Sequence, residues 1–524
     1  MFGARLPQVF LLGLVATAVA LTDTQRCARL AKTHIKNVHS LDTLYLRANE
    51  SYRVPASCGS GLGDDLLAQT SVNVCVVHAI YNTSRTSATR IEVWLPDPDA
   101  WYGRILGTGG GGLAGCVDYD DIKWGSSIHF AAFGHDGGHD APNGVALAKS
   151  DEIIIDYATR ALHVATVTSK LLVRTYYGRP HDNAYYNGCS NGGRQGVRNA
   201  HDFPDDFDGI LAGAPAFNFI NLLAQSNIAN LASHKLKDDD WALVKKEVLR
   251  QCDGLDGLHD EIVTDPDACQ FLPEVLLCQG AKRADCLSPE QVEAVRTIHS
   301  PLYGQSGELL APRLDPGAEL DTGLWPLIFG PSFYEFGQQW WQYVVYNDST
   351  WEPSPDFGYK EIADANAREA QVPVASFDPD LSAFHKRGGK LLTYHGTRDI
   401  LIPSGTSLWY YQRVQRALSL PPSAMDEFYR LFLIPGMSHC YLGADASAWQ
   451  IGQIGFTVWS NASDSHALFA LVDWVEKGTG PETIRGSTLT TTNATTPPTR
   501  LHCKYPAKSV WQPDVQDWTC IESP

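Results

Sequence analysis

The sequence has few charged residues, no internal repeat and no long apolar run beyond its first twenty residues. Charged residues make up 19% of the 524 positions, and Asp plus Glu outnumber Lys plus Arg by 59 to 41, a formal net charge of −18. Such a surplus of negative charge repels phosphate backbones and anionic lipid surfaces, so we expect neither a nucleic acid nor a membrane as a partner. No later stretch approaches the ~18 uninterrupted apolar residues of a membrane-spanning helix.

The rest of the composition is that of an ordinary globular protein, 44% hydrophobic with 45 Gly and 30 Pro. A single hydrophobic core stops growing near roughly 250 to 300 residues. The length therefore predicts two lobes, or one domain that carries a large insertion.

The first twenty residues are typical of a secretory signal peptide. Arg5 supplies the basic start, residues 9–15 the apolar centre, and Ala18-Val19-Ala20 a small-residue cleavage site. We therefore expect residues 1–20 to be removed and the protein to be secreted. Five Asn-x-Ser/Thr sequons, which are typical of surface loops in secreted proteins, lie at Asn49, Asn82, Asn347, Asn461 and Asn493.

All twelve cysteines follow the signal segment, and their even number favours full pairing in an oxidising compartment. The dibasic pair Lys282-Arg283 is either a processing site or an uncut loop. Short spacings favour three local disulfides, namely Cys252 with Cys269, Cys278 with Cys286, and Cys503 with Cys520.

Strand-like and helix-like segments alternate in two parts of the chain. Strand patterns occupy residues 91–96, a segment from 105, and residues 183–187, 210–212, 390–394 and 429–434, with a helical pattern over 153–173. This alternation predicts an α/β sheet. Residues 222–385 interrupt it with acidic turns, cysteines and an aromatic-rich stretch at 325–359. We therefore expect one main domain in two parts, 21–221 and 386–524, with 222–385 inserted as a lid domain.

Gly188-Cys189-Ser190-Asn191-Gly192 is the one match in the chain to the pattern G-x-S-x-G. In this motif, small flanking residues let a strand turn sharply into a helix and expose the Ser hydroxyl. Ser190 is therefore the candidate nucleophile. The alternative is a glycine-rich turn with no catalytic role.

A Ser hydroxyl is a weak nucleophile that needs a base, and in this architecture the acid and the His follow the Ser along the chain. Asp399 follows the expected strand 390–394, and His439 follows 429–434, so both lie where the other triad members belong. Asp136 is a rival carboxylate, but it precedes the Ser and its glycine-rich surroundings favour a turn.

Two cysteines flank these candidates, because Cys189 directly precedes Ser190 and Cys440 directly follows His439. A triad with about 3 Å between hydroxyl and imidazole brings the two thiols near disulfide range. The disulfide and the catalytic geometry therefore predict each other.

An acyl-transfer site also needs donors for the developing oxyanion. The glycine run 109–112 follows an expected strand and is similar to the loop that presents a backbone N–H in lipases and esterases. We expect Gly111 or Gly112, with the Asn191 amide, to be the donors. The alternative is a glycine loop that is only flexible.

Three carboxylates lie close together in the segment 252–262, between glycines. Hard oxygen ligands in a tight turn suit Ca²⁺, with Asp253, Asp256 and Asp260 as side-chain ligands. The spacing does not fit an EF-hand. From the spacing alone, a solvated acidic loop is an equally good interpretation.

Together, Gly188-Cys189-Ser190, Asp399 and His439-Cys440 resemble the fungal tannase and feruloyl esterase family, in particular its feruloyl esterase B members. Further similar motifs stand at residues 111–116, 137–140, 192–196, 343–347 and 426–430. The resemblance implies an α/β-hydrolase fold with a lid domain, and two more disulfides, Cys27 with Cys75 and Cys58 with Cys116. It also implies structural calcium in the lid, bound by Asp253, Asp256, the Leu258 carbonyl, Asp260 and the Ile262 carbonyl.

The resemblance implies a secreted serine carboxylesterase that releases hydroxycinnamic acids, such as ferulate, from plant cell-wall esters through an acyl-enzyme. Its partner would be a small phenolic ester or a feruloylated oligosaccharide. A tannase acting on galloyl esters is the nearest alternative, and a non-catalytic secreted binding protein on a hydrolase scaffold is the alternative from another class. Aromatic residues that either stack on the phenolic group or form the lid core are Trp325, Phe333, Tyr334, Phe336, Trp340 and Trp341.

Overall fold

The computed structural model describes residues 21–55, 67–441, 443, 449–453, 462–488 and 499–522. The expected signal peptide, Cys58 and the sequons at Asn461 and Asn493 lie outside these residues. In the described ranges, no helix is long and apolar enough to cross a membrane.

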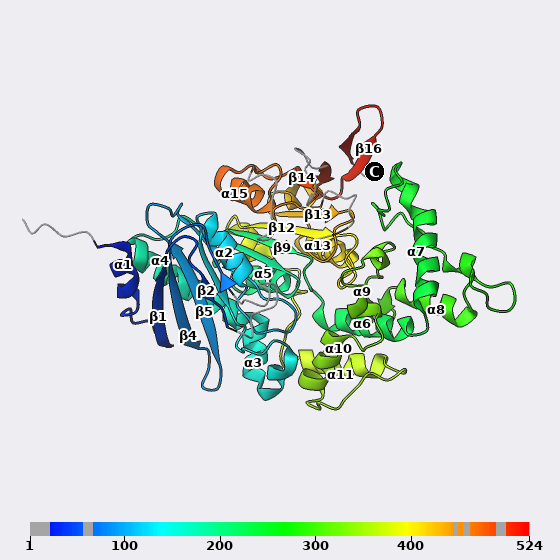
Figure 1. The fold of residues 1–524 in the computed structure, drawn as a ribbon, viewed down its shortest axis with the longest axis horizontal. Coiled ribbons are helices and arrows are strands. Elements are labelled where there is room, and N and C mark those ends of the chain that lie inside the picture. Colours follow the sequence, from blue (N-terminus) through cyan, green and yellow to red (C-terminus); the bar gives the residue numbers. More distant parts are fainter. Residues whose placement is uncertain are drawn as a thin grey trace, which may run out of the picture.

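A nine-stranded mixed sheet forms the centre of the main domain (Figure 1). Its first pairings are antiparallel, and from β7 onward all neighbouring strands run parallel. The parallel strands therefore end at one common edge, where loops can converge. In spatial order the strands are β1 (Val38–Leu46), β4 (Val74–Asn82), β5 (Ala88–Pro96), β7 (Ala131–His135), β6 (Arg104–Thr108), β8 (Asn183–Cys189), β9 (Gly209–Gly213), β12 (Lys390–Gly396) and β13 (Tyr429–Ile434).

Helices cover both faces of this sheet and bury its side chains. On one face pack α1 (Asp23–Leu30), α4 (Ala161–Tyr177), α5 (Asn191–Asp202) and α13 (Gly405–Leu418), and on the other α2 (Tyr119–Ser127) and α15 (Ala467–Lys477). The sequence predicted one helix over 153–173. The structure instead has a short helix α3 (Asp151–Ile155), a π-turn η3 (Asp156–Arg160) and then α4, because one wider turn interrupts the α-helical hydrogen bonds.

Between β9 and β12 the chain adds a mostly helical region with its own apolar core. It contributes a small hairpin, β10 (Leu302–Tyr303) with β11 (Leu309–Ala311), but no strand of the large sheet. In Figure 1 its green helices lie to one side of the sheet. Those helices are α6 (Phe219–Ser233), α7 (Asp238–Cys252), α8 (Pro289–Ile298), α9 (Trp325–Phe329), α10 (Glu335–Trp340) and α11 (Tyr359–Glu369). The short helix α12 (Ser382–Lys386), which follows them, packs Phe384 into the core of the large sheet.

The remaining elements are small. They are α14 (Pro422–Met425) and the two-stranded sheets β2 (Tyr52–Arg53) with β3 (Leu67–Ala68), β14 (Thr483–Ser487) with β15 (Thr499–Cys503), and β16 (Lys508–Gln512) with β17 (Asp517–Ile521).

Five disulfides form between the described cysteines, as expected from the sequence. They include two local bridges in the inserted helical region, the bridge that ties α1 to β4, and the bridge between β15 and β17. The pairs are Cys27–Cys75, Cys189–Cys440, Cys252–Cys269, Cys278–Cys286 and Cys503–Cys520. The expected partner of Cys116, Cys58, lies outside the described residues.

Candidate active site

Ser190 occupies a sharp turn between β8 and α5, with φ 60° and ψ −120°. A non-glycine residue at positive φ is uncommon and strained, and such residues are concentrated at functional sites. Three backbone hydrogen bonds hold this conformation: the Ser190 N–H donates to Gly213 O (2.9 Å), and Ser190 O accepts from Arg194 N (3.0 Å) and Ala216 N (3.2 Å). The surrounding fold therefore fixes the nucleophile elbow that the sequence predicted.

The glycines of the motif are required by close backbone contacts. A Cβ on Gly188 would lie 2.7 Å from the Gly192 carbonyl carbon, and a Cβ on Gly109 would lie 2.5 Å from Gly192 Cα. The second contact places the glycine loop after β6 directly against the start of α5.

Asp399 and His439 form the second half of the site. Asp399 lies in the loop after β12 and His439 in the loop after β13, and His439 Nδ1 is 2.6 Å from Asp399 Oδ2. Asp399 is fully buried, and its Oδ1 accepts the amides of Leu401 (2.8 Å) and Ile402 (2.9 Å). An ionised carboxylate only accepts hydrogen bonds, so Nδ1 carries the proton and Nε2 is left as the basic nitrogen.

A second imidazole, which sequence reasoning missed, also faces this carboxylate. His395 Nε2 lies 3.3 Å from Asp399 Oδ2 and 2.9 Å from Ile402 O, while its Nδ1 lies 2.7 Å from Ser407 Oγ. A carbonyl only accepts, so Nε2 is the donor. Burial alone would raise the pKa of Asp399, but the charge of His439 and the hydrogen bonds of both imidazoles outweigh it and hold the pKa well below its usual range.

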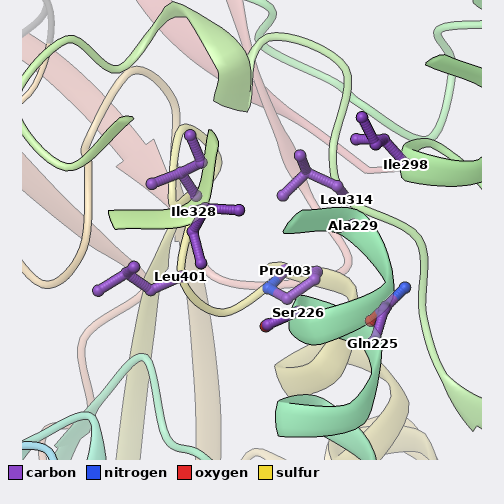
Figure 2. A pocket seen from close by; sticks show the side chains of 9 residues that line it. Gln225, Ser226, Ala229, Ile298, Leu314, Ile328, Leu401 and Pro403 are labelled. Carbon is purple, nitrogen blue, oxygen red and sulfur yellow. The ribbon is translucent and has the colours of Figure 1, made fainter. Parts of the chain in front are cut away.

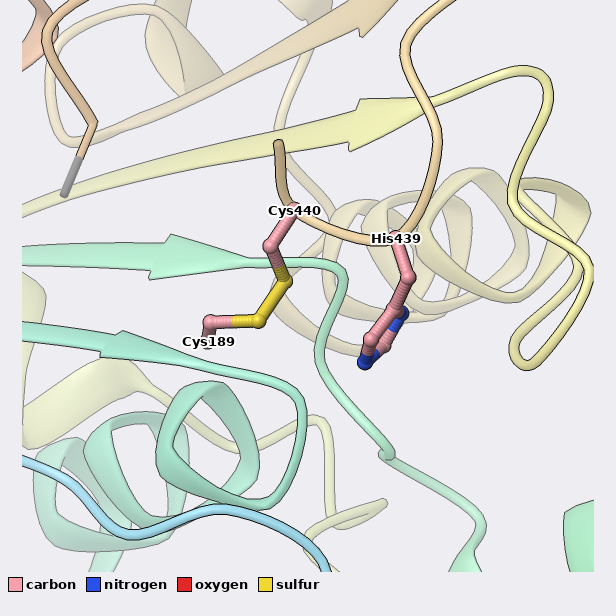
Figure 3. A group of neighbouring side chains, drawn as sticks. All are labelled: Cys189, His439 and Cys440. Carbon is pink, nitrogen blue, oxygen red and sulfur yellow. A yellow bond between two sulfur atoms is a disulfide. The ribbon is translucent and has the colours of Figure 1, made fainter. Parts of the chain in front are cut away.

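The disulfide between Cys189 and Cys440 joins the nucleophile turn to the His loop (Figure 3). The two Cα atoms are 6.0 Å apart, and a ring nitrogen of His439 and both sulfur atoms lie within 4.8 Å of one another. Because both sulfurs are bonded to each other, this trio is not a metal site. Ser190 and His439 are the chain neighbours of the two bridged residues, so the bond brings them to one place at the edge of the sheet.

The rival carboxylate Asp136 belongs to a turn after β7. Its Oδ1 accepts from Thr89 Oγ1 (2.8 Å), Gly138 N (2.9 Å) and Arg90 N (3.0 Å). Burial raises the pKa of Asp136 to about 6. These contacts are those of a structural turn.

The glycine loop has two backbone N–H groups available. Gly109 N donates to Asn187 O (3.2 Å) and Gly110 N to Gln195 Oε1 (3.3 Å), whereas within the described parts of the chain the Gly111 and Gly112 amides have no acceptor. Asn191 is the first residue of α5, where backbone N–H groups lack intrahelical acceptors. The prediction that Gly111 or Gly112, with Asn191, supplies the oxyanion donors is compatible with these amides and stays a prediction.

Helix α10 of the inserted helical region lies over this loop. The Phe336 ring is 3.0 Å from the position of a Cβ on Gly112, and Gly144 N donates to Gln339 Oε1 (2.8 Å). Of the other aromatics considered from the sequence, Trp340 and Trp341 are fully buried and belong to the core of the helical region. Phe336 is the one of these aromatics whose ring contacts the glycine loop.

The acidic loop 252–262 contacts the segment that leads to Asp399, because Arg398 donates a hydrogen bond to Glu261 O. Asp253 Oδ1 accepts from Ile262 N (3.3 Å), and Asp260 Oδ1 accepts from the same amide (3.2 Å), so two carboxylates are close neighbours. Burial first, and then repulsion from Asp256 and Asp253, raise the pKa of Asp260, although nearby Arg500 opposes the shift. The Arg500 nitrogens are 3.7 Å from Asp256 and 3.9 Å from Asp260.

Two cavities lie elsewhere. The one in Figure 2 is about 20 Å³ and is enclosed by α6 and by Leu401 and Pro403, which follow Asp399. A larger one, about 410 Å³, lies between residues 264–267, the start of α13 and residues 503–509. Neither is lined by Ser190 or His439. The candidate site therefore rests on the His439–Asp399 contact and on the disulfide that joins the neighbours of Ser190 and His439.

The fold and the site define a carboxylic ester hydrolase with the α/β-hydrolase fold. A model of the family described as "Tannase and feruloyl esterase" matches residues 74–320 and 347–521. The chain belongs to this family, as its motifs predicted.

Similar proteins agree with this assignment. A "Probable feruloyl esterase B-1" of Neosartorya fischeri is 38% identical, over 98% of this chain and 99% of that protein. The crystal structure of feruloyl esterase B from Aspergillus oryzae is 36% identical with a TM-score of 0.87, over 95% of this chain and 100% of that one. Tannin acyl hydrolase from Aspergillus niger is 25% identical with a TM-score of 0.76, over 96% and 95%.

Proposed function

We propose that the protein is a secreted serine esterase that hydrolyses hydroxycinnamoyl esters, such as feruloyl, caffeoyl and p-coumaroyl esters of plant cell-wall saccharides. The observation that carries the proposal is the 2.6 Å contact between His439 Nδ1 and the buried carboxylate of Asp399. The Cys189–Cys440 disulfide joins the loop of His439 to the turn of Ser190. The similarity to proteins named feruloyl esterase B supports the acyl group.

In the first half of the reaction, Ser190 Oγ attacks the ester carbonyl carbon while His439 Nε2 takes the hydroxyl proton. The negative charge that develops on the carbonyl oxygen is stabilised by the amides of Asn191 and of Gly111 or Gly112. Asp399 holds the imidazolium. Collapse of the intermediate breaks the ester C–O bond, and His439 gives its proton to the leaving alcohol.

In the second half, water attacks the acyl-enzyme. His439 takes a proton from the water, the hydroxide oxygen bonds to the acyl carbon, and the Ser190 oxygen leaves with the proton that His439 returns. The products are the free phenolic acid and the regenerated hydroxyl. Phe336 of α10, which lies against the loop of the oxyanion donors, is suited to stack on the phenolic ring.

The experiment compares initial rates on methyl ferulate, methyl caffeate, methyl p-coumarate and methyl gallate for the protein and its Ser190→Ala variant. Cinnamate rates that fall by about six orders of magnitude in the variant support the proposal. A preference for gallate would make the protein a tannase, which is the second candidate because tannin acyl hydrolase is also similar. A Ser190→Ala protein with undiminished activity would overturn the serine mechanism.

Secretion is part of the proposal. It is supported by five disulfides and by the exposure of all three sequon asparagines that the structure describes, Asn49, Asn82 and Asn347. The domain division at 221/222 and 385/386 is likewise proposed, with the helical region as the lid.

We further propose that the lid loop 252–262 holds structural Ca²⁺. Oxygen ligands suit Ca²⁺, and the Asp253 and Asp260 carboxylates lie close enough to accept hydrogen bonds from the same Ile262 amide. Burial, and after it repulsion from Asp256 and Asp253, raises the pKa of Asp260, and a bound cation would relieve that repulsion. Asp253, Asp256, Asp260 and the carbonyls of Leu258 and Ile262 would hold it. The cation would brace the loop, and no step of ester hydrolysis passes through it.

A further inference from the structure

Tyr157 connects the π-turn η3 to the glycine loop of the active site. It is 1% exposed, and its phenol donates a hydrogen bond to Gly112 O at 2.6 Å. Burial raises the pKa of Tyr157, so the phenol stays protonated and remains a donor. π-turns are often found at functional sites, and this one projects a side chain that a regular helix would place elsewhere.

The backbone carbonyl of the same residue is bound from the nucleophile helix. Arg194 Nη2 donates to Tyr157 O (3.1 Å), and Gln195 Nε2 donates to the same oxygen (3.3 Å). Gln195 Oε1 in turn accepts from Gly110 N at 3.3 Å. Tyr157 therefore contacts the glycine loop directly through its phenol and indirectly through Gln195.

Arg194 extends this network to the other oxyanion donor. The side chain is completely buried and donates to Asn191 Oδ1, Ala158 O and Val374 O, each at 2.8 Å. Among the described carboxylates none forms an ion pair with it. A buried guanidinium that uses its hydrogen bonds on carbonyl oxygens of three separate segments fixes the positions of those segments relative to one another.

The bonds hold the two peptide groups that flank the candidate donors. Gln195 fixes the Gly109–Gly110 peptide through the Gly110 N–H, and Tyr157 fixes the Gly112–Leu113 peptide through the Gly112 oxygen. Between them lie the two peptides that carry the Gly111 and Gly112 N–H groups. A glycine run is otherwise free to rotate, and donors stabilise an oxyanion only when they are oriented in advance.

We propose that Tyr157 is a positioning residue that sets the geometry of the oxyanion donors. Its phenol holds the glycine loop, and its carbonyl, through Arg194 and Gln195, holds that loop against the start of the nucleophile helix. This inference rests on the proposed serine-esterase function.

The test is Tyr157→Phe, which removes the phenol hydrogen bond and keeps the buried ring. The matched control is Tyr177→Phe, because Tyr177 also donates to a backbone carbonyl, Pro96 O at 2.8 Å, at the far end of α4. We expect kcat on methyl ferulate to fall about tenfold in Tyr157→Phe, less than the loss of a whole oxyanion donor. KM should stay within about twofold, as for an interaction made mainly in the transition state.

A second measurement is the inhibition constant of a trifluoromethyl ketone that adds to Ser190 and places an oxyanion at the donors. A variant that only loses stability would leave this constant unchanged. The inhibition constant should rise in Tyr157→Phe by the same factor as kcat falls, and stay unchanged in Tyr177→Phe. Gln195→Met, which releases Gly110, should act in the same direction.

If Tyr157→Phe and Gln195→Met both keep the wild-type kcat and the wild-type affinity for the ketone, this inference is wrong, while the proposed esterase function stands. A protein inactive on every ester, or a fully active Ser190→Ala variant, would overturn the proposed function and this inference with it. Equal losses in Tyr157→Phe and Tyr177→Phe would show a general stability effect and also overturn it.

Discussion

Cys189 and Cys440, which are 251 residues apart in the sequence, are joined by a disulfide that makes the nucleophile turn and the His loop one unit. The bond connects the ends of β8 and β13, between which two other strands lie. Loops at the ends of separate strands can otherwise move independently. Here the distance between nucleophile and base is limited by a covalent bond.

The first prediction is that Cys189→Ala with Cys440→Ala lowers both stability and turnover. In the chain-entropy model a loop of this size is worth roughly 5 kcal/mol, and measured losses are commonly about 2 to 5 kcal/mol. We expect a comparable fall in the free energy of unfolding, measured with urea. We also expect a fall in kcat, because the His loop becomes freer.

The control for that experiment is Cys503→Ala with Cys520→Ala. This pair closes a loop of only 17 residues, between β15 and β17. It should cost stability while kcat at a temperature where the protein is folded remains that of the wild type. An equal loss of kcat in both double variants would contradict a specific role for the Cys189–Cys440 bond.

The second prediction concerns the pH dependence of Asp399. Its pKa is lowered in the folded protein, so the carboxylate contributes stability above the unfolded value near about 4, and that contribution is lost as the pH falls below it. The stability advantage of the wild type over Asp399→Asn should therefore shrink on acidification. At neutral pH kcat should fall about 10⁴-fold in this variant.

Asp136→Asn is the matched control, because the stability difference between wild type and variant should change with pH in the opposite direction. Burial raises the pKa of Asp136 to about 6, so the wild type loses stability relative to the variant as the pH rises from about 4 through 6. Urea unfolding across this range measures both differences. If kcat falls as far in Asp136→Asn as in Asp399→Asn, the assignment of the triad acid is wrong.

The sequence predicted best those strands whose residue pattern is continuous along the chain. The bounds of β13 match the predicted strand 429–434, because a buried parallel strand is mostly apolar, and Arg430 is the one charged residue in this run. Strand β1 was missed. Its pairing with β4 shifts register between Val38 and Ser40, and this bulge breaks the alternation that marks a half-exposed strand.

The candidate site divides in the same way. Ser190, Asp399 and His439 follow from a motif and from chain order. The roles of Tyr157 and Arg194 do not, because their side chains donate to backbone oxygens of Gly112 and Val374, which only the fold brings near. Tyr157 also depends on a π-turn inside an apparently regular helix. Backbone acceptors leave no residue pattern in a sequence.

The third prediction is that Phe336→Ala changes acyl selectivity. Loss of the ring beside Gly112 should reduce kcat/KM for methyl ferulate roughly tenfold, the size of one aromatic contact. The rate on p-nitrophenyl acetate, which has no ring in its acyl group, should change little. Phe333→Ala is the control, because that ring contacts His234 in the lid. Equal losses on both esters would show that Phe336 only supports the loop.

The fourth prediction is that a chelator destabilises the protein through the lid loop. A cation that binds only the folded state raises the melting temperature by mass action, so EDTA should lower the melting temperature of the wild type and added Ca²⁺ should restore it. Asp256→Asn should lower the melting temperature and abolish the response. Asp285→Asn is the matched control, since this exposed carboxylate pairs with Arg283, outside the loop 252–262, and the variant should keep the full response. A wild type that does not respond to EDTA would overturn the calcium proposal and leave Arg500, which lies near Asp256 and Asp260, as the positive charge beside these carboxylates.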